Sequence, residues 1–87
     1  MIKFFTDDGW SDYVYWQNED RKTLKRINML LKDIDRNGHK GVGKPEPLAG
    51  KLSGWWSRRI SDKNRLIYRI EGDSIIIAAC RYHYNDH

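Results

Sequence analysis

The chain has 87 residues, with 16 lysines and arginines, 12 acidic residues and one cysteine. This length predicts one domain, residues 1–87, whose small core is filled in part by 4 tryptophans, 5 tyrosines and 2 phenylalanines. One cysteine excludes an internal disulfide, and the sequence has neither an N-terminal export signal nor an apolar stretch of membrane-spanning length. We therefore expect a cytoplasmic protein without a membrane partner.

Basic residues are concentrated in the middle of the chain. Residues 1–20 carry one lysine against five acidic residues, residues 21–69 carry fourteen basic against four acidic residues, and residues 70–87 carry one arginine against three acidic residues. Four arginines of the middle segment lie close together, beside two tryptophans: Arg58, Arg59, Arg65, Arg69, Trp55 and Trp56. Arginine beside aromatic side chains suits RNA phosphates and bases. Solvated surface charge is the alternative, and it accounts well for the scattered lysines.

The first forty residues predict a short strand followed by two helices. Ile2–Phe5 is apolar and reads as the strand, and Thr6 is a suitable N-cap for the first helix. A second helix is predicted from about Asp20, with one apolar stripe that ends before Asn37 and Gly38. We expect the two helices to form an antiparallel hairpin whose apolar side chains belong to the core.

The segment 38–54 has the composition of a loop, with five glycines and both prolines. The prolines flank Glu46, and each restricts the residue before it, so Lys44 and Glu46 are expected to be extended. A carboxylate held away from helix and sheet, with cations nearby, suits a general base acting on an anionic substrate. A surface connector with a solvated glutamate is the simpler alternative.

Three further strands are predicted at Trp55–Ile60, Arg65–Glu71 and Ser74–Tyr84. Strand alternation places Leu66, Tyr68 and Ile70 on one face, and Arg65, Ile67 and Arg69 on the other. Arg81 and His83 share a face if the last strand stays regular to its end. The predicted fold class is α+β, with the helical hairpin packed on one side of a twisted, mainly antiparallel sheet and a basic face on the other.

Two other kinds of site are not supported by the sequence. Gly38, Gly43 and Lys44 have the spacing of a nucleotide-binding P-loop, but Pro45 occupies the position of the magnesium-binding hydroxyl and no helix follows. No metal site is predicted, because no set of three ligands is formed by the candidates His39, Cys80, His83 and His87.

RNA can be cleaved with few protein groups, because its own 2′-hydroxyl is the nucleophile. The protein must supply a base for that hydroxyl, cations for the pentavalent phosphorane and an acid for the 5′-oxygen. Glu46 suits the first role, Arg59 and Arg65 the second, and His83 the third. For a lone histidine near a chain end, a surface or core position is the alternative.

Five parts of the chain carry a family resemblance: the opening around Trp10–Gln17 and the runs Lys44–Leu48, Leu52–Ile60, Asn64–Tyr68 and Ala78–Tyr84. Together they closely resemble the YoeB/Txe toxins of bacterial toxin–antitoxin pairs. These toxins belong to the RelE-like superfamily. The resemblance covers nearly the whole chain. It implies a microbial-ribonuclease (RelE-like) fold without a cofactor. It also implies a ribosome-dependent endoribonuclease that cleaves mRNA in the A site, leaves 2′,3′-cyclic phosphate and 5′-hydroxyl ends, and halts translation.

The resemblance also implies roles for single residues. Glu46 corresponds to the base, Arg65 to the phosphate-stabilising arginine, His83 to the general acid or transition-state stabiliser, and Tyr84 to the aromatic that positions RNA. The other residues expected to contact RNA are Arg59, Arg58, Lys51, Lys44 and Trp55. The chain departs from the family at Ala49, where a lysine can stand and for which Lys51 is the nearest substitute, and in the added tail, residues 85–87.

The implied partners are a cognate YefM/Axe-like antitoxin, the 70S ribosome and mRNA, and homodimerisation is left open. A disordered antitoxin segment is expected to fold over the basic cleft. Two other functions stay open at this point. One is a ParE-like inhibitor of DNA gyrase, which needs no base or acid. The other is a non-catalytic RNA- or ribosome-binding module, for which the basic middle and the tryptophans suffice.

Overall fold

The computed structural model describes residues 1–82 as two helices and a five-stranded sheet. The elements are β1 (Ile2–Phe5), α1 (Asp7–Glu19), α2 (Arg21–Asn37), β2 (Glu46–Pro47), the 3-10 helix η1 (Gly50–Leu52), β3 (Trp56–Arg59), β4 (Arg65–Glu71) and β5 (Ser74–Ala79). The strand order is β1-β5-β4-β3-β2, with β1 parallel to β5 and the other pairs antiparallel. The α+β prediction is confirmed.

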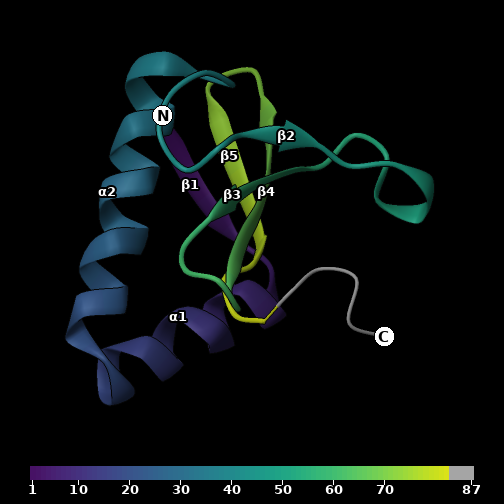
Figure 1. Cartoon of the computed structure of the whole chain (residues 1–87). Helices are drawn as coiled ribbons and strands as arrows, with labels where there is room; N and C mark the ends of the chain where they lie inside the picture. The colour runs from purple at the N-terminus through teal and green to yellow at the C-terminus, as the bar shows by residue number, and fades with distance from the viewer. Residues whose placement is uncertain (83–87) are drawn as a thin grey trace.

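Both helices begin where the sequence predicts, and α2 also ends there. The Thr6 hydroxyl accepts a hydrogen bond from the Gly9 N–H, and the Asp20 carboxylate accepts hydrogen bonds from the first turn of α2. Gly38, with φ 62°, closes α2 in a conformation that favours glycine. Only Asp20 separates the helices, and α1 crosses near the start of α2 rather than running along it, so the antiparallel arrangement expected for the two helices is wrong (Figure 1). Neither helix is both long and apolar enough to cross a membrane.

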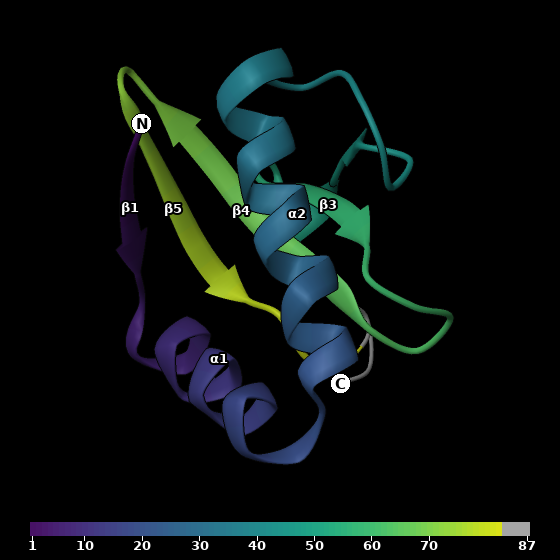
Figure 2. The same cartoon turned by 90° about the vertical axis from the view of Figure 1, so that its left-hand side faces the viewer.

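The core lies between α2 and one face of the sheet, which we call the inner face (Figure 2). Fully buried side chains from α2, β4 and β5 meet there: Ile27, Leu30, Ile34, Leu66, Tyr68, Ile75 and Ile77. The predicted inward set of β4 is therefore confirmed, since Ile70 also packs against this cluster. The opposite side of the sheet is the outer face.

The conformation expected around Glu46 is wrong in two respects. Lys44 is not extended, because its φ of 51° lies in the left-handed region. Glu46 is not held away from the sheet, because Glu46 and Pro47 form the edge strand β2 and pair with Ser57 and Trp56 of β3. A proline is tolerated there because an edge strand leaves one row of N–H groups unpaired.

The last strand is shorter than predicted. It ends at Ala79 because α1 binds the backbone of the next residue, Cys80. The Cys80 N–H donates to the Asp12 carboxylate at 3.0 Å, and the Trp16 indole N–H donates to the Cys80 carbonyl at 2.8 Å. The chain then turns, with φ 64° at Tyr82. The prediction that the last strand continues regularly beyond Ala79 is therefore wrong as far as Tyr82, the last described residue.

We predict that Gly9→Ala destabilises the protein, although alanine normally favours a helix. A Cβ at Gly9 would meet the backbone carbonyl of Ile77 in β5, which cannot move without disturbing the strand. The loss is expected to be about 1–3 kcal/mol. Urea unfolding followed by circular dichroism measures it, with the exposed Ser11→Ala as the control in the same helix. A gain in stability would show that α1 does not pack this closely against β5.

Candidate active site on the outer face

Strand register places three predicted catalytic or binding residues on the outer face. Glu46 is opposite Ser57, and Arg59 is opposite Arg65. Directly opposed residues share a face, and so do residues two apart in one strand. Glu46, Arg59 and Arg65 therefore lie on the same side of the sheet, away from α2. We call these three residues the outer site.

The two arginines of the outer site are held differently. Arg59 is exposed, and its guanidinium makes no hydrogen bond within residues 1–82. Arg65 is only 8 % exposed, and its Nη1 donates to the backbone carbonyls of Ser61, Asp62 and Asn64. Within the same residues neither guanidinium is paired with a carboxylate. The outer site thus combines one carboxylate with an exposed arginine, Arg59, and a nearly buried one, Arg65.

The chain returns to the outer site at the end of its described part. The Tyr82 N–H donates to Asn64 Oδ1 at 2.6 Å, and the Tyr82 carbonyl accepts from the Arg65 N–H at 3.0 Å. These two bonds fix Tyr82 beside the first residue of β4. His83 and Tyr84, the predicted acid and the predicted RNA-positioning aromatic, lie outside the described residues, and their assignments stay predictions.

The Arg58 side chain is fully buried and so is not available to RNA, which makes that expectation wrong. It lies on the inner face and makes five hydrogen bonds, one of them to Tyr68. The other acceptors are the Asp33 carboxylate and the carbonyls of Gly38, Lys40 and Val42. Sequence patterns cannot separate such an arginine from a surface one, because the acceptors come from distant residues. Arg58 is a structural residue.

The Arg58–Asp33 pair is also electrostatic. The hydrogen bond from Arg58 is the largest of the causes that lower the pKa of Asp33 below its usual value. A lowered folded-state pKa means that the pair stabilises the fold at neutral pH. This contribution is lost as the pH falls through the folded-state pKa of Asp33.

The Arg58 network holds the loop that leads to Glu46. The carbonyls of Gly38, Lys40 and Val42 converge on one guanidinium, and the Val42 N–H donates to Asp33. Immediately after this loop, the Gly43 carbonyl accepts from the Arg59 N–H at 2.7 Å. The chain therefore enters β2 from a fixed position, and the location of Glu46 depends on Arg58.

The remaining predicted RNA-binding residues surround β2. Lys44 is exposed two residues before Glu46, and Lys51 is exposed in η1. The segment between β2 and β3, which carries Lys51, extends away from the sheet (Figure 1). Trp55 is half-buried, and the Arg69 guanidinium lies 4.8 Å from the centre of its ring. Their contacts with RNA stay predictions.

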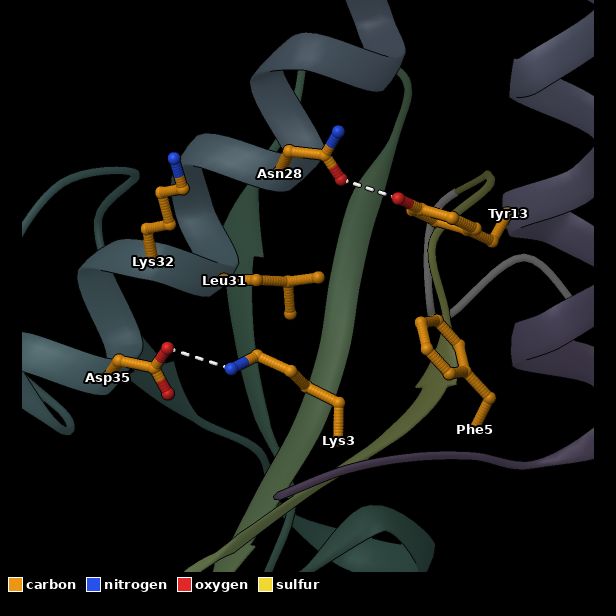
Figure 3. A pocket seen from close by; sticks show the side chains of 7 residues that line it. All are labelled: Lys3, Phe5, Tyr13, Asn28, Leu31, Lys32 and Asp35. Atoms are coloured by element: carbon orange, nitrogen blue, oxygen red, sulfur yellow. Dashed lines mark hydrogen bonds and ion pairs between the residues drawn. The ribbon is translucent and has the colours of Figure 1, made fainter. Parts of the chain in front are cut away.

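The largest described cavity is not part of the outer site. It has a volume of about 450 Å³ and lies between β1, α1 and α2. Four of its polar side chains are paired, since Lys3 pairs with Asp35 at 2.7 Å and the Tyr13 hydroxyl donates to Asn28 at 2.6 Å (Figure 3). Within residues 1–82, no group of three histidine, cysteine or acidic side chains is placed to hold a metal ion.

Residues 5–84 match the family model described as YoeB-like toxin of bacterial type II toxin-antitoxin system. Toxin YoeB of Streptomyces coelicolor is 59% identical over 80 residues, which cover 92% of this chain and 95% of that protein. A YoeB-YefM complex and a YoeB dimer from Staphylococcus aureus contain chains 46% and 47% identical to this one. Both superpose with a TM-score of 0.91 and cover 97% of this chain and 98% of theirs.

We predict that Arg58→Met lowers the stability of the fold by about 3–5 kcal/mol, as is typical when one partner of a buried ion pair is removed. Methionine fills part of the volume but donates none of the five hydrogen bonds. Urea unfolding measures the loss, and Arg21→Met, which removes an exposed arginine from α2, is the matched control. Equal stability of the two variants would contradict the structural role of Arg58.

Proposed function

Because this chain belongs to the YoeB-like toxins of bacterial type II toxin–antitoxin systems, within the RelE-like superfamily, we propose that it is a ribosome-dependent endoribonuclease that cleaves mRNA in the A site and inhibits translation. The observation that supports this proposal is the outer site, in which strand register puts Glu46 on the same face as Arg59 and Arg65. A carboxylate beside two arginines matches the needs of a 2′-hydroxyl attack on phosphate. The site of action is the bacterial cytoplasm.

The proposed reaction is an internal transfer within RNA. Glu46 removes the proton of the 2′-hydroxyl, and the 2′-oxygen forms a bond to the adjacent phosphorus. Arg59 and Arg65 stabilise the negative charge of the phosphorane. The bond from phosphorus to the 5′-oxygen then breaks, and His83 donates a proton to this leaving group. The products are a 2′,3′-cyclic phosphate and a 5′-hydroxyl, and Tyr84 positions the RNA.

The proposal includes three partners. The 70S ribosome presents the mRNA, and the exposed cations Lys44, Lys51 and Arg59 supply charge for RNA contacts. A YefM-like antitoxin is proposed as the third partner, because a YoeB from Staphylococcus aureus forms a complex with YefM. The net charge of +4 favours an acidic antitoxin segment. A homodimer is proposed from the dimer of the same relative.

Glu46 and the arginines also distinguish this function from the two other candidates. A gyrase inhibitor or a passive RNA-binding module gains nothing from a carboxylate on the same face as two arginines, since it repels the phosphate that the arginines attract. An exposed glutamate on the same face as these arginines has a role if its carboxylate accepts a proton from the substrate. The described outer site therefore favours the nuclease.

We predict that Glu46→Gln removes most of the cleavage and leaves the fold and ribosome binding intact. The amide has the same shape but cannot accept the 2′-hydroxyl proton, and loss of a general base typically costs about 10²–10⁴-fold in rate. Single-turnover cleavage of a short message on purified ribosomes measures the effect. Glu19→Gln, at the exposed end of α1, is the control. A variant that cuts at the wild-type rate would show that Glu46 is not the base.

Variants of Arg59 and Arg65 distinguish a role of the charge in catalysis from a role of the side chain in stability. Arg59→Ala should lower the single-turnover rate by about 10²-fold, as for removal of one transition-state donor. It should leave the urea midpoint unchanged, because the Arg59 side chain is exposed. Arg65→Ala should lower both the rate and the midpoint, because Arg65 also binds three loop carbonyls. Lys63→Ala, which removes an exposed cation nearby, is the control.

The opposite pattern for Arg59 would reassign it. If Arg59→Ala weakens ribosome binding while the rate at saturating toxin is unchanged, the side chain docks the toxin and does not stabilise the phosphorane.

A further inference from the structure

His39 lies in the loop that joins α2 to β2, and its ring stacks on Trp56. The ring centroids are 3.9 Å apart and the planes differ by 11°, so the contact is face to face. The Tyr68 ring lies beyond, at 6.1 Å. The carbonyls of the residues on either side, Gly38 and Lys40, both accept hydrogen bonds from Arg58, which fixes the backbone at His39. The stack is therefore a contact between a fixed part of the loop and β3.

The stack lies close to the proposed base in the strand pairing. Trp56 is paired with Pro47 across the β2–β3 ladder, and Glu46 precedes Pro47. The pair of strands is short, with two residues in β2, so few other contacts hold β2 in place. The Leu48 N–H extends the ladder by donating to the Trp55 carbonyl at 2.9 Å. His39 thus stacks on the β3 residue that pairs with Pro47, the neighbour of Glu46.

The surroundings of the ring favour its neutral form. Nδ1 is buried and has no hydrogen-bond partner within residues 1–82. Burial is the main cause that lowers the pKa of His39 below its ordinary 6.5, and the nearby Arg58 cation adds to it. An imidazolium over an indole is normally attracted to the ring. Here a second cation beside Arg58, with a buried Nδ1–H that lacks an acceptor within residues 1–82, opposes that attraction.

We propose that His39 is a positioning residue for Glu46: its neutral imidazole, stacked on Trp56, holds β2 in place against β3, and protonation of the ring releases this support. The catalytic consequence rests on the proposed function, whereas the structural link between His39 and β2 does not. The stack contributes stability that is present above pH 6.5 and is lost as the pH falls through the folded-state pKa of His39.

Among residues 1–82, the charged and titratable groups around His39 leave no counterion for an imidazolium. On β3 the neighbour is Arg58, and on β4 it is the Tyr68 hydroxyl, which accepts from Arg58. On α2, the Asp33 carboxylate already binds Arg58, Asn37 and Val42. In the loop itself, Lys40 is a cation. Glu46 of β2 lies on the outer face, on the other side of the sheet.

A nuclear magnetic resonance titration of the full chain tests the link without any activity. Three signals are followed from about pH 8 to about pH 5, the range in which histidine titrates: the His39 ring, the Trp56 indole N–H and the Leu48 amide. We expect one shared midpoint below 6.5. His39→Phe keeps a ring for stacking and should abolish the pH dependence at Trp56 and Leu48. Lys40→Ala, in the same loop, should leave it unchanged. A Leu48 amide that does not follow His39, or that still titrates in His39→Phe, would overturn the proposal.

Cleavage assays add a readout that a purely structural role would not change. At saturating ribosomes, His39→Ala should lower the chemical rate by up to about 10²-fold, as expected when a catalytic group is misplaced. His39→Phe should restore most of it. The ratio of wild-type to His39→Phe rates should fall as the pH is lowered, which separates His39 from His83 and from the ribosome. A pH-independent ratio would overturn the positioning role. If the wild type itself does not cut, the proposed function fails and the titration alone decides.

Discussion

The buried guanidinium of Arg58 fixes the loop before β2 and thereby the sheet edge that β2 forms. Burying an arginine is costly unless every N–H finds an acceptor. Arg58 finds them in one carboxylate, one hydroxyl and three carbonyls of a glycine-rich loop without a hydrophobic core of its own. Gly41 is part of this solution, because a Cβ there would meet the Asp33 carboxylate. The loop is thereby held as firmly as a secondary-structure element.

Strand alternation then gives two adjacent arginines opposite roles. Arg58 points inward and holds the loop, and Arg59 points outward, where it faces solvent beside Arg65. The same loop delivers Glu46 to the edge strand on the outer face. The candidate anion site therefore lies on the outer face of the sheet, where Arg65 is nearly buried while Glu46 and Arg59 are exposed.

Local signals were sufficient for much of this fold. The caps at Thr6 and Asp20, the apolar stripe of α2 and the alternation of β4 specify elements that the structure confirms. The sequence did not reveal β2, because a Pro-Glu-Pro run reads as a loop until β3 is beside it. The early end of β5 was also missed, since it depends on Asp12 and Trp16 of a distant helix. For the site, Glu46, Arg59 and Arg65 were predicted, and Arg58 was misassigned because its burial arises from long-range acceptors.

The most direct test of the central claim, that the outer site performs metal-free transfer on mRNA, is the chemistry of the ends it makes. A short message is translated in a purified bacterial system with and without the protein, the cut is mapped by primer extension, and the ends are identified by mass spectrometry. The account predicts one cut in the A-site codon, with a 2′,3′-cyclic phosphate and a 5′-hydroxyl, and only when ribosomes are present. An uncut message, or fragments with 5′-phosphate ends, would contradict it.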